Sequence, residues 1–181
     1  MKKIIITVAA FFSLCNVSDA QDEKYDPQTE KINLGVGMGF DYGGLGANLL
    51  VYPQKNIGVF AGGGYALAGF GYNVGVKGRF FLKEGSAVSP FLMGMYGYHT
   101  AIRVENNTAL NKLFYGPTFA AGIDWRVGRL RKNYLSIALT VPVRNGDEKT
   151  YRDALVNNHG AQFENDFLPV GLSLGYRLRL K

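Results

Sequence analysis

The last stretch of the chain, residues 168–181, alternates without interruption between large apolar residues and small or basic ones. A period of two residues is typical of a β-strand with two unlike faces. Strands of soluble proteins usually run about 5–6 residues, whereas this alternation would span roughly 40 Å at ~3.3 Å per residue. The length of this strand constrains the fold most strongly. The apolar positions are Leu168, Val170, Leu172, Leu174, Tyr176, Leu178 and Leu180.

The residues between these apolar positions are mostly glycine, serine and arginine. Small or paired polar side chains suit the narrow inside of a small barrel, and leucines suit an outer face in contact with lipid. A strand tilted by ~40° would cross the ~25 Å apolar band of a membrane β-barrel. We therefore interpret residues 168–181 as the closing strand of a transmembrane β-barrel.

Seven further segments predict strands, which makes an even number, as in bacterial single-chain barrels. The expected fold class is all-β, an eight-stranded antiparallel up-and-down transmembrane β-barrel. Connections after even strands are short and two of those after odd strands are longer, which predicts that both termini are periplasmic. The expected strands are 31–40, 45–52, 57–67, 72–82, 90–104, 113–127, 134–144 and 167–181.

The fifth of these segments, 90–104, is hard to orient because both of its faces carry aromatic residues and methionines. We place Leu92, Tyr96, Tyr98 and Ile102 on its outer face.

The first twenty residues have the features of a secretory signal peptide. Lys2 and Lys3 precede an apolar core too short to span a membrane, and Ala20 ends a cleavage-site pattern before Gln21. We expect a signal peptide at 1–20, a periplasmic lead at 21–30 and the barrel at 31–181. Lipidation at Cys15 is a competing reading, disfavoured because the preceding residue is not small.

The charge of the chain argues against nucleic-acid binding. The full chain has a net charge of +6, and removal of two lysines and one aspartate with residues 1–20 leaves 18 basic and 13 acidic residues, or +5. The basic residues are dispersed along strand faces instead of forming one exposed run. We expect neither a metal site nor a cofactor, because no cluster has the spacing of metal ligands.

Aromatic residues gather near the expected strand ends, where amphipathic rings meet the two interfaces of a membrane. The aromatic residues predicted at these interfaces are Tyr65, Tyr115, Trp125, Tyr134 and Tyr176.

This pattern resembles the small eight-stranded outer-membrane barrels of Gram-negative bacteria, the porin-like family of the outer membrane protein A transmembrane domain. The resemblance covers residues 31–181 and rests on architecture. It implies a monomer in the outer membrane that contacts lipid and lipopolysaccharide and is inserted by the assembly machinery. Barrels of this family usually end in an aromatic residue, whereas here the last aromatic is Tyr176.

Buried charges must pair, and Asp124 is the acidic residue that we expect on an inner face. The expected interior cluster joins Asp124 to Arg79 or Arg126, with Lys77 nearby. The excess of cations would also suit a narrow anion-preferring path. We therefore expect a structural or surface-interaction protein with minor pore activity, without catalytic residues.

Two other functions stay open. A lipid-modifying enzyme would use His99 or His159, although no serine is well spaced from either. A secreted lipocalin-like barrel would turn Ile137, Leu172 and Leu174 inward. The acidic loop 145–166, which is expected to hold a short helix near 148–155, is either a solvated loop or a ligand-facing site.

Overall fold

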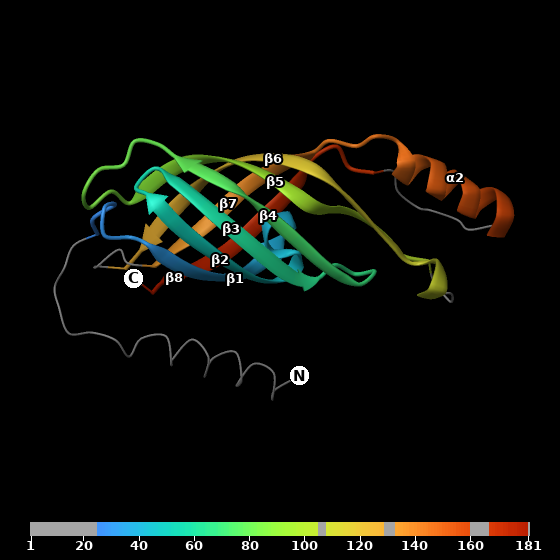
Figure 1. The fold of residues 1–181 in the computed structure, drawn as a ribbon, viewed down its shortest axis with the longest axis horizontal. Helices are drawn as coiled ribbons and strands as arrows, with labels where there is room; N and C mark the ends of the chain where they lie inside the picture. The colour runs from blue at the N-terminus through green and yellow to red at the C-terminus, as the bar shows by residue number, and fades with distance from the viewer. Residues whose placement is uncertain (1–24, 105–107, 129–132, 160–166, 181) are drawn as a thin grey trace, which may run out of the picture.

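The structure, a computed structural model, describes residues 25–104, 108–128, 133–159 and 167–180. Eight antiparallel strands follow one another around a closed barrel, and β1 pairs with β8 to complete it (Figure 1). The predicted all-β fold, an eight-stranded antiparallel up-and-down barrel, is confirmed. The strands are β1 (Ile32–Gly39), β2 (Gly44–Gln54), β3 (Ile57–Tyr65), β4 (Phe70–Arg79), β5 (Val88–Ile102), β6 (Lys112–Val127), β7 (Asn133–Pro142) and β8 (Gly171–Arg179).

The alternating residues of the strands place apolar side chains on the outside of the barrel and mostly polar side chains on its inside. Leu172 is 56 % exposed and Leu174 is 38 % exposed, so both lie on the outer face. The lipocalin-like alternative required these two side chains in the centre. Other exposed apolar residues of the wall include Val36, Met38, Leu45, Leu49, Val59, Val74, Val76, Leu92, Phe119, Leu139 and Val141.

The inside also contains a compact apolar cluster beside its polar groups. Small residues allow these larger side chains to fit within the barrel, whose interior is just wide enough for side chains at eight strands. The cluster consists of Leu50, Tyr52, Phe60, Phe91, Met93, Met95, Ala120 and Ala138.

The connection between β1 and β2 folds into the barrel as the short 3-10 turn η1 (Phe40–Tyr42). Gly43 adopts a left-handed φ of 69°, which glycine accepts without strain and which reverses the chain at this point. A side chain at Gly175 would place its Cβ 2.0 Å from the Tyr42 hydroxyl oxygen. Glycine on the inner face therefore makes the room that η1 occupies.

The bounds of the expected strands differ from the observed ones by up to four residues, and two of the differences have a clear structural cause. β8 begins at Gly171 instead of residue 167, and Pro169, which has no N–H to donate, lies in the unpaired segment before it. In β5, Leu92 and Tyr96 face outward as expected, but Tyr98 and Ile102 are buried. Ile102 is turned inward by a register shift between Tyr98 and Thr100, because one extra residue reverses the faces that follow it. Tyr98 precedes the shift, and its ring is covered by an edge-on contact with Phe40, with the ring centres 5.5 Å apart.

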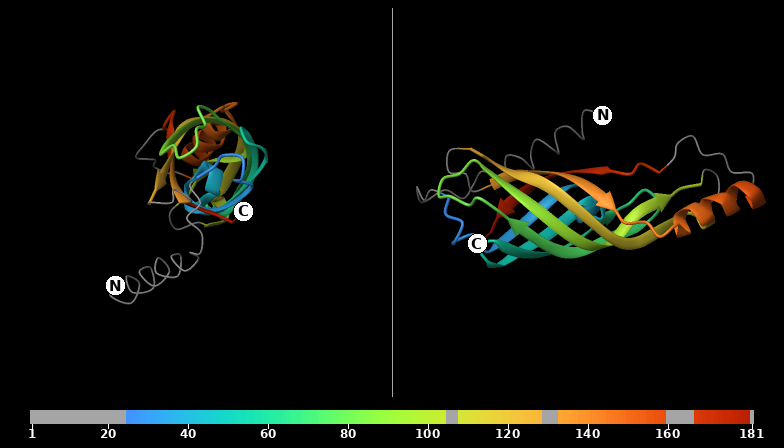
Figure 2. Two further views of the ribbon diagram at one scale, coloured as in Figure 1. Left: turned by 90° about the vertical axis from the view of Figure 1, so that its left-hand side faces the viewer. Right: turned by 90° about the horizontal axis from the view of Figure 1, so that it is seen from above.

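The long β5–β6 hairpin and helix α2 (Asp147–His159) extend beyond the barrel at the end opposite the N-terminal lead and the end of β8 (Figures 1 and 2). Ile102, Phe114 and Leu155 join the hairpin and the helix in a second apolar cluster. The helix predicted near 148–155 is therefore present and somewhat longer. Within the described ranges, no helix is both long and apolar enough to cross a membrane.

Candidate functional site

Buried polar and charged side chains run along the inside of the barrel from one end to the other. They form three groups among the described residues: one at the end that carries the N-terminal lead, one in the middle and one under helix α2. The charged members are Glu30, Asp41, Lys77, Arg79, Asp124, Arg126, Glu148 and Arg177.

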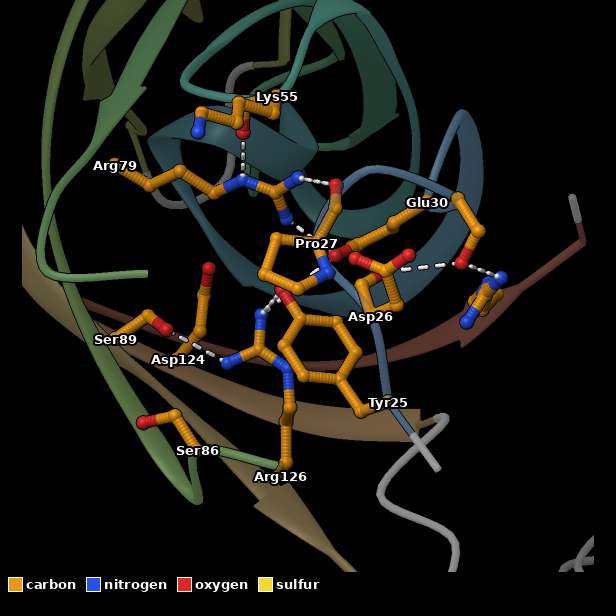
Figure 3. A network of polar contacts seen from close by, with 12 residues as sticks. Tyr25, Asp26, Pro27, Glu30, Lys55, Arg79, Ser86, Ser89, Asp124 and Arg126 are labelled. Carbon is orange, nitrogen blue, oxygen red and sulfur yellow. Dashed lines mark hydrogen bonds and ion pairs between the residues drawn. The ribbon is translucent and has the colours of Figure 1, made fainter. Parts of the chain in front are cut away.

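At the lead end, two arginines from strands β4 and β6, which flank β5, converge on one carboxylate (Figure 3). Arg79 Nη1 forms a close ion pair with Glu30 Oε2, and Arg126 Nη2 lies 3.6 Å from the same oxygen. All three side chains are buried. Arg79 also donates from Nε to the Lys55 carbonyl oxygen at 2.6 Å, so its guanidinium is held from two sides.

The lead, residues 25–30, is docked inside this end of the barrel instead of extending away from it. Arg126 Nη2 donates to the Tyr25 hydroxyl at 2.5 Å, and its guanidinium carbon lies 3.7 Å from the centre of the Tyr25 ring. Arg79 Nη2 donates to the Pro27 carbonyl oxygen at 3.2 Å. The backbone N–H of Gly85 donates to the Tyr25 carbonyl oxygen at 2.9 Å.

The charges of this group perturb its titration. Burial alone raises the pKa of Glu30, but the positive charges of Arg79 and Arg126 outweigh it, so the pKa of Glu30 lies below its ordinary value. Burial and the negative charge of Glu30 raise the pKa of Tyr25. Glu30 therefore remains a carboxylate and Tyr25 a neutral phenol at neutral pH.

In the middle of the barrel, Lys77 on β4 meets Asp124 on β6. Lys77 Nζ donates to Asp124 Oδ1 at 2.7 Å, and Ser136 Oγ donates to the same oxygen at 2.9 Å. Both charged side chains are fully buried. Lys77 Nζ also lies 3.7 Å from the centre of the Phe91 ring, a cation–π contact that partly replaces water around the ammonium.

A second ion pair in the middle depends on η1, which carries Asp41 into the barrel. Arg177 Nη2 donates to Asp41 Oδ2 at 3.1 Å, and Arg177 Nη1 donates to Asn48 Oδ1 at 2.6 Å. Ser173 donates a short hydrogen bond to the other oxygen of Asp41. The turn is thus held to β8 by charge-assisted hydrogen bonds, and Asn48 Nδ2 of β2 donates to the Asp41 carbonyl oxygen at 2.6 Å.

Under α2, the imidazole of His99 is held between two partners. His99 Nε2 lies 3.3 Å from Glu148 Oε1, and His99 Nδ1 lies 3.0 Å from Thr100 Oγ1. Arg144 Nε donates to the same hydroxyl at 3.4 Å. These contacts connect the first turn of α2 to the top of β5.

The structure brings the predicted cluster residues to the inside but pairs them differently. Asp124 bonds Lys77, whereas Arg79 and Arg126 bond Glu30, so the expected pairing of Asp124 with an arginine was wrong. The reason is that Glu30 of the lead takes up both arginines, while Lys77 Nζ reaches Asp124 from β4.

Three buried acidic residues were missed by sequence reasoning: Glu30, Asp41 and Glu148. The sequence places them in the lead, in a turn and in a loop, where acidic residues are ordinarily solvated. A signal was present, because the several cations expected inside exceeded the single acid, and buried cations need partners.

The aromatic residues predicted at interfaces do not all lie outside. Tyr65, Tyr115 and Trp125 are exposed, and Tyr176 is half-buried. Tyr134 is buried and lies inside the barrel, 5.5 Å from the guanidinium of Arg126 by ring centre. Its placement at an interface was therefore wrong: in the paired register of β7 its side chain falls on the inner face.

No group of three or more histidine, cysteine, aspartate or glutamate side chains in the described part of the chain could hold a metal ion. The predicted signal peptide and Cys15 lie outside the described residues, as does the side chain of His159. No protein-family model matches the chain, and no curated protein matches it.

Proposed function

We propose that the protein is an integral β-barrel of the outer membrane of a Gram-negative bacterium, with a structural or surface-interaction role and no catalytic activity. The observation that carries the proposal is the distribution of side chains. Leucines, valines and aromatic residues cover the outside of the wall, whereas the buried ion pairs lie on the inside, beside the inner apolar cluster. Soluble monomers rarely expose large contiguous apolar surfaces, whereas lipid is a suitable solvent for such a wall.

The two ends of the barrel support a proposed orientation of the chain in the membrane. The lead and the end of β8 share one end, which we propose to be periplasmic, and α2 with the β5–β6 hairpin forms the outer end. Membrane lipid and lipopolysaccharide are then the partners of the wall, and the assembly machinery is a transient partner during insertion. The protein would act as a monomer.

The ion-paired interior supports a structural role over a transport role. The arginine and lysine side chains inside the barrel are paired with carboxylates at successive levels. A transported ion would therefore meet few unpaired charges. We expect single-channel recordings to show minor conductance at most, with the α2 end available for surface contacts.

The test is membrane fractionation of the expressed protein, followed by gel mobility of the detergent extract with and without boiling. An intact barrel should fractionate with the outer membrane and shift in mobility on heating. Recovery of a monodisperse protein in plain buffer would contradict the proposal, because the exposed leucines of the wall would then have to be tolerated by water.

A lipid-modifying enzyme is a second candidate, favoured by the contact of His99 with both Thr100 and Glu148. Hydrolases use such a hydroxyl, imidazole and carboxylate in sequence. Against it, Thr100 is only 6 % exposed and its hydroxyl also contacts Arg144. Deacylation of labelled lipopolysaccharide that is lost in His99→Ala, with the heat-shifted mobility retained, would favour the enzyme.

A further inference from the structure

We propose that Arg79 and Arg126 form a carboxylate-binding site at the lead end of the barrel, which the chain fills with its own Glu30. The lead then occupies this site from within the same chain, with Glu30 bound to both arginines (Figure 3). A small organic carboxylate that reaches this end of the barrel competes with Glu30 for them.

The first argument is the balance of charge. In the middle of the barrel, Lys77 is matched by Asp124 and Arg177 by Asp41, one carboxylate for each cation. At the lead end two guanidinium groups share the carboxylate of Glu30. Since an unmatched buried cation is costly, this end retains a positive charge that a further anion would neutralise.

The second argument is unused hydrogen-bonding capacity. Arg126 donates to Ser89 Oγ at 2.8 Å and to Tyr25, but it reaches Glu30 only at 3.6 Å, and its buried Nε has no partner among the described residues. Glu30 Oε1 likewise has none. A carboxylate with both oxygens placed between the arginines would match their planar donors better than Glu30 does.

The third argument is that the lead can leave without disturbing the barrel. Strand pairing begins after it, with the Tyr52 N–H bonded to the Lys31 carbonyl oxygen at 2.8 Å. The lead is held by polar contacts to Arg79, Arg126, Arg179 and the Gly85 N–H, and by stacking of the Tyr25 ring on Arg126. A soluble carboxylate can replace the contacts that Glu30 makes to the two arginines.

The test is chemical rescue of Glu30→Ala in the full chain. This substitution removes the two carbons and two oxygens of an acetate ion, so acetate is the probe that fits the vacated space. We expect the unfolding midpoint of Glu30→Ala to fall and then to rise saturably with acetate. Acetamide, which has the same shape without charge, and sodium chloride at equal ionic strength should not restore it.

Glu30→Gln is the matched control, because its amide fills the space and blocks entry of the probe. A midpoint that rises equally in both variants, or equally with acetate and acetamide, would overturn the site. The assay runs in any medium that keeps the protein monodisperse, so its result does not depend on the membrane proposal.

A second variant decides the matter if Glu30→Ala does not fold. Tyr25→Ala removes the ring that covers Arg126 and retains Glu30, so acetate should raise its midpoint more than it raises that of the unaltered protein. An identical response of the two proteins to acetate would overturn the proposal.

Discussion

The buried pair of Lys77 and Asp124 should behave as a unit, and a double-mutant cycle with Lys77→Met and Asp124→Ala can show this. In Asp124→Ala the lysine keeps its contact with the Phe91 ring but loses its carboxylate. In Lys77→Met the aspartate keeps only its hydrogen bond from Ser136. Each single variant therefore leaves one charge without a counter-charge inside the barrel.

The expected magnitudes follow from the burial of both side chains, which are 0 % exposed. Removing one partner of a buried ion pair costs about 3–5 kcal/mol, whereas replacing both partners by apolar groups is often close to neutral. If the two sites were independent, the double variant would lose about 6–10 kcal/mol, the sum of the single costs. The pairing predicts a smaller loss for the double variant than for either single one.

The assay is equilibrium urea unfolding of the protein in lipid vesicles or detergent, followed by the fluorescence of Trp125. The four proteins are measured under one condition, and the coupling free energy is the deviation from additivity. Single losses that simply add would refute the reasoning, because they would mean that Lys77 and Asp124 do not compensate each other in the folded state.

Three further predictions use other parts of the chain. The pKa of Glu30 lies below its ordinary value of 4.5, so the carboxylate stabilises the folded protein fully above pH 4.5, and this stabilisation is lost as the pH falls through the lowered pKa. Glu30→Gln should therefore be less stable than the unaltered protein at pH 7. In a series of urea midpoints against pH, the variant should lose less stability at acidic pH than the unaltered protein does. Gly37→Ala would place a Cβ 2.4 Å from a backbone oxygen of β8 and should lower the free energy of unfolding in urea by about 1–3 kcal/mol. Gly94→Ala is the control and should be tolerated, because its Cβ would meet the Phe119 ring at 3.7 Å. Val74 is 50 % exposed, and Val74→Arg should cost about 2–4 kcal/mol in lipid vesicles; a change within about 0.5 kcal/mol would instead suit a water-exposed wall.

The comparison of β5 with β8 shows where sequence reasoning succeeds and where it stops. The facing of β8 could be read directly, because leucines alternate with glycines and arginines along it. The facing of Ile102 could not, because an extra residue in β5 shifts the register before it and nothing in the local pattern marks the shift. A face is a local property of a strand only as long as its pairing is regular.

By itself, the sequence determined the number of strands, their order and which side of most strands is apolar. These properties depend on the alternation of neighbouring residues, which is local to each strand. Only the tertiary structure decided the partners of the buried charges. Lys77 and Asp124 are 47 residues apart, and Arg79 and Glu30 are 49 apart. Closure of the barrel sets their level along the wall, and it also creates the space into which η1 and the lead carry Asp41 and Glu30.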